Sequence, residues 1–240
     1  MKKIMSLFSS FVFMVSCCAG PVGNVPMPQA PSGPTMSKDK KSHHVEAVRR
    51  IKHLTVKLSD MDPGGPGGLC SAIWIRQGML LTANHCVKEA MMMSYVAFDD
   101  PEDVMRLAIP LAKDVDNDIA VLYVDPTSEP PHDVAQLSDD VIESGEDVDI
   151  VGHTLGLDWT YSKGYVAAVR SNMSGPGTTE AEKVIQISSP AWMGNSGGGA
   201  FDDDGRLVGI CSWVSTSGPF LTFFIHRDTI RQFLKREIAI

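Results

Sequence analysis

From about Val45 to Asp228, short runs of β-branched and apolar residues alternate with turn-forming Gly, Pro, Asn and Asp. Such runs are typical of strands, and many of them in succession predict an all-β sandwich or barrel. The predicted strands cover 53–58, 71–75, 79–82, 94–98, 119–124, 148–151, 165–171, 184–188, 207–213 and 221–225.

The last residues of the chain follow a different pattern. Ile230, Phe233, Leu234 and Ile238 recur at the spacing of a helix. We therefore predict a short C-terminal helix over 228–240, with Asp228 as its N-cap.

A stretch over 126–139 that contains adjacent prolines and several acids divides the strand-rich region into halves of comparable size. We predict that it links an N-terminal half, 45–125, to a C-terminal half, 140–227. Residues 17–44 are rich in Pro, Gly, Ser and Met without apolar periodicity, which predicts a flexible tether.

The first residues have the features of an export signal. Lys2 and Lys3 precede a mostly apolar run over 4–15, which is too short to span a bilayer comfortably. We predict a signal peptide over 1–16 and an exported protein, periplasmic or at the cell surface.

The signal ends in Met14-Val15-Ser16-Cys17, which resembles the lipobox of bacterial lipoproteins. That resemblance implies lipidation of Cys17 and a membrane anchor. Ordinary secretory cleavage and a retained leader are the alternatives.

Composition narrows the function classes. The 240 residues carry Lys+Arg 21 against Asp+Glu 29, a net charge of −8 that repels phosphate backbones and makes nucleic acid an unsuitable partner. The acidic run Asp202-Asp203-Asp204-Gly205 lacks the EF-hand pattern and is typical of a hairpin turn. The histidines show no ligand spacing, so we expect no metal and no cofactor.

Ser196 lies in the glycine-rich segment Gly194-Asn195-Ser196-Gly197-Gly198. A nucleophilic serine must project from a tight turn while backbone N–H groups face the developing oxyanion, and glycine permits both. We predict that the amides of Gly194 and Ser196 form that oxyanion hole. Taken alone, the segment also fits an ordinary turn.

A β-rich run ends in a small-residue turn that holds His85, and an imidazole can take and return a proton near neutral pH. Further along, Asp118 directly precedes an apolar strand, where its carboxylate can orient such a ring. Asp114, Asp116 and Asp118 could each equally be a solvated turn acid.

The order His, Asp, Ser is that of chymotrypsin-like proteases. Thr82-Ala83-Asn84-His85, Asp118-Ile119-Ala120-Val121-Leu122 and the Ser196 segment resemble the three catalytic blocks of that superfamily, and are most similar to its HtrA-like bacterial branch. The resemblance implies two antiparallel six-stranded β-barrels, with His85, Asp118 and Ser196 as the catalytic triad in the cleft between them.

The resemblance also implies a disulfide between Cys70 and Cys86, because trypsin-like enzymes have a similar bridge beside the catalytic histidine. Two buried free thiols are the alternative. Cys211 then has no evident partner and is expected to pack on a strand.

Ser212-Trp213 resembles the edge strand on which trypsin-like enzymes bind the substrate backbone. The resemblance implies that the main chain of Ser212 to Val214 pairs with substrate and that Trp213 forms the floor of the neighbouring pocket. An ordinary core tryptophan is the alternative.

The specificity pocket is expected near 189–193, with Pro190 and Met193 in its wall, and near 214–220. None of these residues is acidic, whereas a buried Asp would select Lys or Arg. Val214 narrows the mouth, so we predict a preference for a small or medium apolar residue before the scissile bond.

Two departures from the family bear on regulation. Asn195 has no charge to pair with a newly cut N-terminus, so we do not expect zymogen-type activation. Only one predicted helix follows the protease-like region, so we expect no PDZ module.

Together these features predict a serine endopeptidase that acts on protein or peptide substrates. A catalytically inactive peptide-binding module of the same fold is the main alternative, and a structural surface lipoprotein is a second. The presence of all three triad residues favours the enzyme.

Overall fold

The computed structural model describes residues 38–60, 69–87, 92–100, 102, 104–127, 133–175, 178–215 and 221–240. The predicted signal peptide, Cys17 and most of the predicted tether lie outside the described residues. No helix in the described part of the chain is long and apolar enough to cross a membrane.

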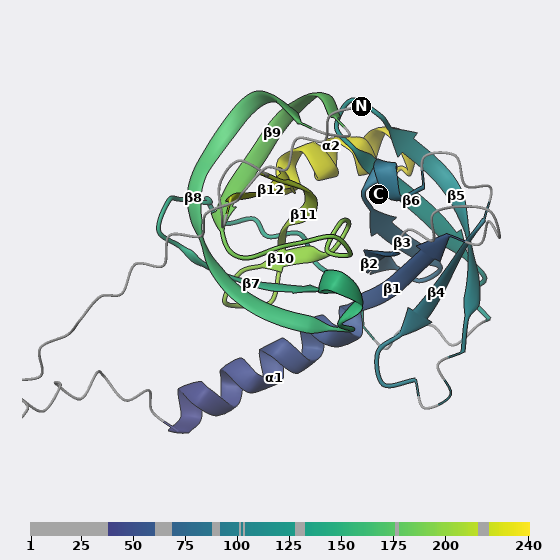
Figure 1. Cartoon of the computed structure of the whole chain (residues 1–240), viewed down its shortest axis with the longest axis horizontal. Helices are drawn as coiled ribbons and strands as arrows, with labels where there is room; N and C mark the ends of the chain where they lie inside the picture. The colour runs from purple at the N-terminus through teal and green to yellow at the C-terminus, as the bar shows by residue number, and fades with distance from the viewer. Residues whose placement is uncertain are drawn as a thin grey trace, which may run out of the picture. The chain divides into compact units, whose positions relative to one another are not determined.

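The strands form two closed antiparallel barrels of six strands each, which confirms the predicted all-β, chymotrypsin-like fold (Figure 1). The first barrel has the order β1-β2-β3-β6-β5-β4, and the second has the order β10-β11-β12-β9-β8-β7. The first barrel comprises β1 (Thr55–Asp60), β2 (Leu69–Arg76), β3 (Met79–Thr82), β4 (Met93–Ala97), β5 (Arg106–Asp114) and β6 (Ile119–Val124). The second comprises β7 (Asp147–Gly152), β8 (Thr160–Gly175), β9 (Thr178–Ser188), β10 (Gly199–Phe201), β11 (Leu207–Val214) and β12 (Leu221–His226).

Strand β5 is absent from the strands predicted from the sequence. Its outward-facing Leu107, Ile109 and Leu111 are apolar and exposed, so the strand lacks the alternation of apolar and polar residues that marks a half-buried strand. Pro110 lies in its middle, and a proline within a run of residues argues against a strand when the sequence alone is considered. The ladder with β6 shifts register at this point, between Pro110 and Ala112.

A helix, α1 (Lys38–Leu54), precedes the first strand where the sequence suggested the end of a tether and then a strand from residue 53. Ile51 and Leu54 are fully buried, and Arg50 donates a hydrogen bond to the Gly205 carbonyl at 3.1 Å. The sequence of α1 is predominantly polar, so its short apolar face did not predict a helix. Packing against the barrels, rather than strong amphipathicity, accounts for this helix.

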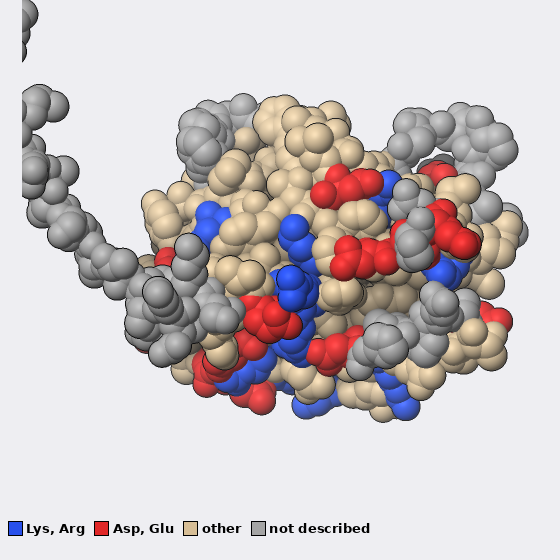
Figure 2. Space-filling model, turned by 90° about the horizontal axis from the view of Figure 1, so that it is seen from below, with Lys and Arg blue, Asp and Glu red and all other residues tan. Residues whose placement is uncertain are grey.

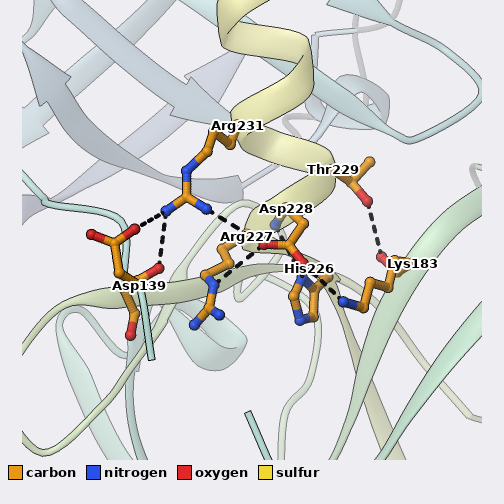
Figure 3. Close-up of polar contacts among 8 residues, drawn as sticks. Asp139, Lys183, His226, Arg227, Asp228, Thr229 and Arg231 are labelled. Carbon is orange, nitrogen blue, oxygen red and sulfur yellow. Dashed lines mark hydrogen bonds and ion pairs between the residues drawn. The ribbon is translucent and has the colours of Figure 1, made fainter. Parts of the chain in front are cut away.

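The C-terminal helix is present as α2 (Arg227–Glu237), but its N-cap is His226 and not Asp228 as predicted. The His226 Nδ1 accepts a hydrogen bond from the Asp228 N–H at 3.0 Å, as Figure 3 shows. The Asp228 carboxylate is instead paired with Lys183 at 2.8 Å. Arg231 binds Asp139 at 2.6 Å, so polar contacts join α2 both to β9 and to the segment between the barrels.

One apolar cluster joins the two barrels. It contains Leu81 and Val121 from the first barrel, Phe201 and Ile210 from the second, and residues of both helices. Each barrel has a further cluster of its own. Because the shared cluster is continuous and buried, it holds the facing ends of β3, β6, β10 and β11 in one fixed arrangement.

The surface does not present a field of one charge on the face drawn in Figure 2, where acidic and basic side chains lie beside one another. The acidic run that begins at Asp202 forms the predicted hairpin turn between β10 and β11. Asp202 N–H donates to the Arg206 carbonyl at 2.9 Å, and Gly205 adopts a positive φ of 71°.

Replacement of Leu54 by alanine tests whether α1 belongs to the folded domain. Leu54→Ala removes a fully buried side chain from the shared cluster, so we expect a loss of about 2–4 kcal/mol in the free energy of unfolding, measured by urea denaturation. Val45→Ala changes an exposed residue of the same helix and should stay within about 0.5 kcal/mol of the parent. Equal effects of the two substitutions would contradict the packing of α1.

Candidate active site

The register between β3 and β6 brings His85 and Asp118 together. Thr82, the last residue of β3, pairs with Ala120 near the start of β6. The residues that follow β3 and those that precede β6 therefore meet at the same edge, where the Asn84 N–H donates to the Asp118 carbonyl at 3.1 Å. His85 lies in the short 3₁₀ turn Asn84–Cys86, and Asp118 has a left-handed φ of 54° that turns its side chain toward it.

The Asp118 carboxylate holds His85 at two points. Its Oδ2 lies 2.8 Å from His85 Nδ1, and its Oδ1 accepts the His85 backbone N–H at 2.8 Å. Because a carboxylate only accepts, Nδ1 carries the proton and Nε2 is left with a free lone pair. The sequence assigned this role to Asp118, with a solvated turn acid as the alternative, and the structure places the Asp118 carboxylate against the ring.

Asp114, one of the alternative acids, has a different environment. It accepts hydrogen bonds from the backbone and side chain of Asn117 and pairs with Arg236 at 2.8 Å. Burial raises the pKa of Asp114, but these hydrogen bonds outweigh the burial and hold its pKa below the ordinary value. Asp114 thus shapes the turn before Asp118.

Ser212 contributes a contact that the sequence analysis missed. Its hydroxyl donates a short hydrogen bond to Asp118 Oδ2 from β11 of the second barrel. The Asp118 side chain is completely buried, and a buried carboxylate needs several donors to offset the loss of water. A serine beside the predicted edge-strand tryptophan was visible in the sequence, but nothing local indicated where its hydroxyl pointed.

The turn that holds Ser196 packs against the segment that leads to His85. The Ser196 carbonyl accepts the Ser71 N–H, and the Gly197 N–H donates to the Cys211 carbonyl, both at 2.8 Å. A Cβ atom on Gly197 would lie 2.2 Å from Thr82 Oγ1 and 3.0 Å from the Ala83 nitrogen. Glycine is therefore required at 197, and the close contact places the Ser196 turn beside the end of β3.

The amides predicted to bind an oxyanion are available. Neither the Gly194 nor the Ser196 N–H donates a hydrogen bond within the described part of the chain. The Met193 carbonyl accepts the Leu155 N–H at 2.8 Å. Since C=O and N–H point in opposite directions across a trans peptide, this bond turns the Gly194 N–H away from Leu155.

The segment that follows β7 packs against the serine turn and fixes its position. Asn195 is buried, and its Oδ1 accepts the hydroxyl of Thr154 at 2.8 Å. A Cβ atom on Gly152 would lie 2.3 Å from Asn195 Oδ1, and one on Gly194 would lie 2.1 Å from the His153 carbonyl oxygen. The sequence indicated that Asn195 cannot form an ion pair with a newly cut N-terminus. In the structure its side chain instead accepts a neutral hydrogen bond from Thr154.

His153 connects the same segment to the first barrel. It is fully buried, lies 3.3 Å from Asp158 Oδ1, and packs edge-on against Trp159. Asp158 in turn pairs with Lys57 of β1 at 2.6 Å, and the Trp159 indole donates to the Thr55 carbonyl at 3.0 Å. Burial lowers the pKa of His153 to about 4, although Asp158 acts in the opposite direction.

The Cys70–Cys86 disulfide is present, as the family resemblance implied. Cys86 Sγ lies 3.7 Å from the Ser196 carbonyl oxygen, so the bridge is beside the serine turn. Among the described residues, the one cluster with metal-ligand spacing is Cys70, His85 and Cys86. Its two sulfurs are bonded to each other and offer no thiolate to a metal. Cys211 is buried without a disulfide partner, as expected.

One edge of β11 is open beside Ser196 in the described part of the chain. The ladder to β10 reaches only Ile210, whereas Trp213 and Val214 pair with β12 on the opposite side. Trp213 is 8% exposed and stacks on Phe223 with ring centroids 5.0 Å apart, so it has the contacts of a core residue.

The residues predicted to line the specificity pocket are only partly described. Pro190 and Met193 are exposed, and Val214 is half-buried next to the open edge of β11. Residues 216–220, which the sequence analysis also placed there, lie outside the described residues.

A buried carboxylate bound to a histidine lies beside a serine turn between the two barrels, and the Gly194 and Ser196 amides of that turn make no hydrogen bond among the described residues. This arrangement resembles the site of serine hydrolases. The family model for the trypsin-like peptidase domain matches residues 70–210, and the chain belongs to this family.

The relatives of the chain are serine endoproteases of the HtrA and DegP type. It is 28% identical over 183 residues to Protease Do-like 1, chloroplastic, of Arabidopsis thaliana, and 30% identical over 153 residues to the periplasmic pH-dependent serine endoprotease DegQ of Escherichia coli strain K12. The matches cover 74% and 63% of this chain but only 40% and 32% of those proteins. The chain thus spans less than half the length of these curated relatives.

Solved structures of the same fold agree. A protease from M. tuberculosis in its active form superposes with a TM-score of 0.71 at 20% identity, over 90% of this chain and 94% of the other. An HtrA-type protease with a tripeptide gives a TM-score of 0.68 at 26% identity, over 80% of this chain and 62% of the other. These similarities confirm the resemblance inferred from the sequence motifs.

The buried His153 predicts a loss of stability in mild acid. The pKa of His153 is about 4 in the folded protein and 6.5, the ordinary histidine value, in the unfolded chain. As the pH falls from 6.5 to 4, the unfolded chain therefore takes up a proton that the folded protein does not. The stability contributed by neutral His153 is complete above pH 6.5 and declines by about 2–3 kcal/mol across this window.

The test is urea denaturation of the parent and His153→Gln at several pH values between 4 and 7.5. The variant should show a shallower decline, and the difference between the two profiles isolates His153 from the carboxylates. His43→Gln, which changes an exposed histidine, should leave the profile unchanged. Identical profiles for the parent and His153→Gln would show that His153 is not held neutral by burial.

Proposed function

We propose that this chain is a serine endopeptidase in which Ser196 is the nucleophile, His85 the general base and Asp118 the residue that orients His85. Ser196 Oγ attacks the carbonyl carbon of a peptide bond while His85 Nε2 takes its proton. The amides of Gly194 and Ser196 stabilise the oxyanion. The C–N bond then breaks as His85 gives the proton to the leaving nitrogen, and water hydrolyses the resulting ester of Ser196 by the same route.

The observation that carries this proposal is the double contact of Asp118 with His85 beside the serine turn. The two bonds of 2.8 Å leave the ring one tautomer and one orientation. The side chain of His85 is 32% exposed, so the ring is open to a substrate while its carboxylate partner is not. Imidazolium formed during attack would be stabilised by the buried negative charge.

The Ser196 hydroxyl makes no hydrogen bond to His85 among the contacts of the described residues. Catalytic hydrogen bonds are often long without substrate and tighten when it binds, so the proposal requires this hydrogen bond to form in the Michaelis complex.

The open edge of β11 supports a polypeptide substrate. An extended chain that pairs with the main chain of Ser212 to Val214 would present its carbonyl to Ser196. Val214 supports a small or medium apolar residue before the scissile bond. The exposed Pro190 and Met193 add no charge that would attract Lys or Arg.

The alternative of an inactive peptide-binding module would use the same edge. It would not need a buried carboxylate held by three donors, nor a serine turn with two amides that make no hydrogen bond among the described residues. These features support the enzyme over the binding module.

For location, we propose export followed by lipid anchoring at Cys17. The basic Lys2 and Lys3, the apolar run over 4–15 and the lipobox-like residues before Cys17 support this proposal. The Cys70–Cys86 bridge is consistent with an oxidising compartment. The relatives named periplasmic endoproteases agree with export.

Labelling by a fluorophosphonate probe tests the nucleophile. The parent should become labelled at Ser196, and Ser196→Ala should remain unlabelled while it keeps the same urea midpoint. Turnover of a denatured protein substrate should fall at least about 10³-fold in the variant. A folded parent that neither reacts with the probe nor cleaves the substrate would support the binding module instead.

Replacement of Ser212 by alanine tests the support of Asp118. The loss of a hydrogen bond to a buried carboxylate costs about 1.5–3 kcal/mol, so we expect kcat/KM for peptide hydrolysis to fall about ten- to a hundredfold. Ser94→Ala is the control, because Ser94 is a buried serine whose hydroxyl donates to the Ser59 carbonyl at 3.4 Å, far from Asp118 in the first barrel. Unaltered kcat/KM in Ser212→Ala would argue against the role of this hydroxyl.

A further inference from the structure

Three side chains beside the serine turn have the composition of a zinc site. Cys70, His85 and Cys86 each offer one ligand atom, and these three atoms lie within 4.8 Å of one another. Zinc binds such ligands tetrahedrally, with bonds of about 2.3 Å to sulfur and about 2.0–2.1 Å to nitrogen, so its ligand atoms lie about 3.5–3.8 Å apart. The three side chains are therefore close enough to converge on one ion after small movements.

The disulfide closes this site to a metal, because neither sulfur is a thiolate while Cys70 and Cys86 are bonded to each other. A dithiol that reduces the bridge supplies two electrons and two protons. The S–S bond breaks, two thiols form and the dithiol itself becomes a disulfide. When Zn²⁺ binds, the two thiols release their protons and form two Zn–S bonds.

Contacts other than the bridge hold the two cysteines in place. Cys70 lies in β2, where it is paired with Leu58 of β1. The Cys86 N–H donates to the Ala83 carbonyl at 3.2 Å, which closes the short turn after β3. Because none of these contacts involves the S–S bond, we expect both thiols to stay at the site when the bridge is reduced.

His85 has the contacts of a zinc-binding histidine. Metal-bound histidines almost always donate their other ring N–H to a carboxylate, a carbonyl or water, which fixes the tautomer and strengthens the ligand. Asp118 Oδ2 provides this contact to His85 Nδ1 at 2.8 Å, so the nitrogen with an available lone pair is Nε2. The His85 side chain is 32% exposed, which leaves the ring accessible to an ion from solvent.

We propose that reduction of the Cys70–Cys86 bridge creates a zinc site in which the two thiolates and His85 Nε2 bind one Zn²⁺ ion. Thiolate and imidazole ligands favour zinc over the hard cations Mg²⁺ and Ca²⁺. The bound ion occupies the lone pair with which His85 would take the proton of Ser196, so zinc inhibits the reduced enzyme. This inhibition rests on the proposed function, whereas the binding of the metal does not.

Titration with Co²⁺ tests the site without reference to activity. Cys17→Ser and Cys18→Ser are introduced into every protein, so that these two thiols cannot bind the metal. The protein is reduced with dithiothreitol, freed of the reductant under nitrogen, and titrated while thiolate-to-cobalt charge-transfer absorption is recorded. We expect one Co²⁺ per chain in the reduced protein, displaced by Zn²⁺, which binds such ligands more tightly, and none in the oxidised protein.

Four substitutions identify the ligands. Cys86→Ser removes one thiolate and His85→Ala removes the imidazole, so each should lower the affinity of the reduced protein for Co²⁺ at least about tenfold. Two matched controls remove the same chemical groups elsewhere. Cys211→Ala removes a buried free thiol and His53→Ala removes an exposed histidine of α1, so both should bind Co²⁺ as the unsubstituted site does.

Fluorophosphonate labelling tests the inhibition. With saturating Zn²⁺, the reduced protein should be labelled at Ser196 at least about tenfold more slowly than the same protein after the metal is removed with EDTA, because the general base is lost. The same concentration of Zn²⁺ should leave the rate of labelling of the oxidised protein unchanged.

The outcomes separate this inference from the proposed function. A reduced protein that loses its native circular dichroism, that binds no Co²⁺, or that binds it equally well in His85→Ala would overturn the zinc site. A reduced protein labelled at the same rate with and without bound Zn²⁺ would overturn the inhibition. A folded oxidised protein that never reacts with the probe would overturn the proposed function, while the cobalt titration would still decide whether the zinc site exists.

Discussion

The buried carboxylate of Asp118 is the constraint on which the arrangement of the site depends. It lies without solvent contact between the two barrels, where an unpaired charge would be strongly unfavourable. Donors from both barrels surround it, namely the His85 ring and backbone from the first and the Ser212 hydroxyl from the second. Any relative displacement of the barrels would remove a donor, so the charge that holds the His85 ring also stabilises the contact of Asp118 with Ser212 of β11.

A second set of contacts fixes the serine turn. The turn forms hydrogen bonds with β2, with β11 and with the segment after β7. That segment is in turn joined to the first barrel through Lys57, Asp158 and Trp159. The backbone geometry of Gly194 is thus determined by contacts from both barrels, with Thr154 and Asn195 forming a neutral hydrogen bond at the centre. In such an arrangement the amides proposed to bind the oxyanion are held in place before any substrate binds.

Local sequence signals predicted the features that depend on local chemistry. The short apolar strands indicated a sandwich or barrel, whereas the segments of Ser196, His85 and Asp118 were each ambiguous alone. The family resemblance supplied the two barrels, the triad and the Cys70–Cys86 pair. Features set by tertiary contacts were missed. The α1 helix is stabilised by two buried residues, Ile51 and Leu54. Strand β5 could not be recognised from the sequence, because it contains Pro110 and its exposed face is apolar. The direction of the Ser212 hydroxyl and the hydrogen bond from Thr154 to Asn195 depend on residues far away in the sequence.

The packing of α1 changes where the folding unit begins. A fragment that started at the first strand would retain every barrel residue. It would lack Ile51 and Leu54, however, and the shared apolar cluster would contain a cavity in their place. Such a fragment would expose apolar surface where the two barrels meet. The minimal autonomous piece of this chain therefore extends upstream of its β-structure, to the residues of the preceding helix.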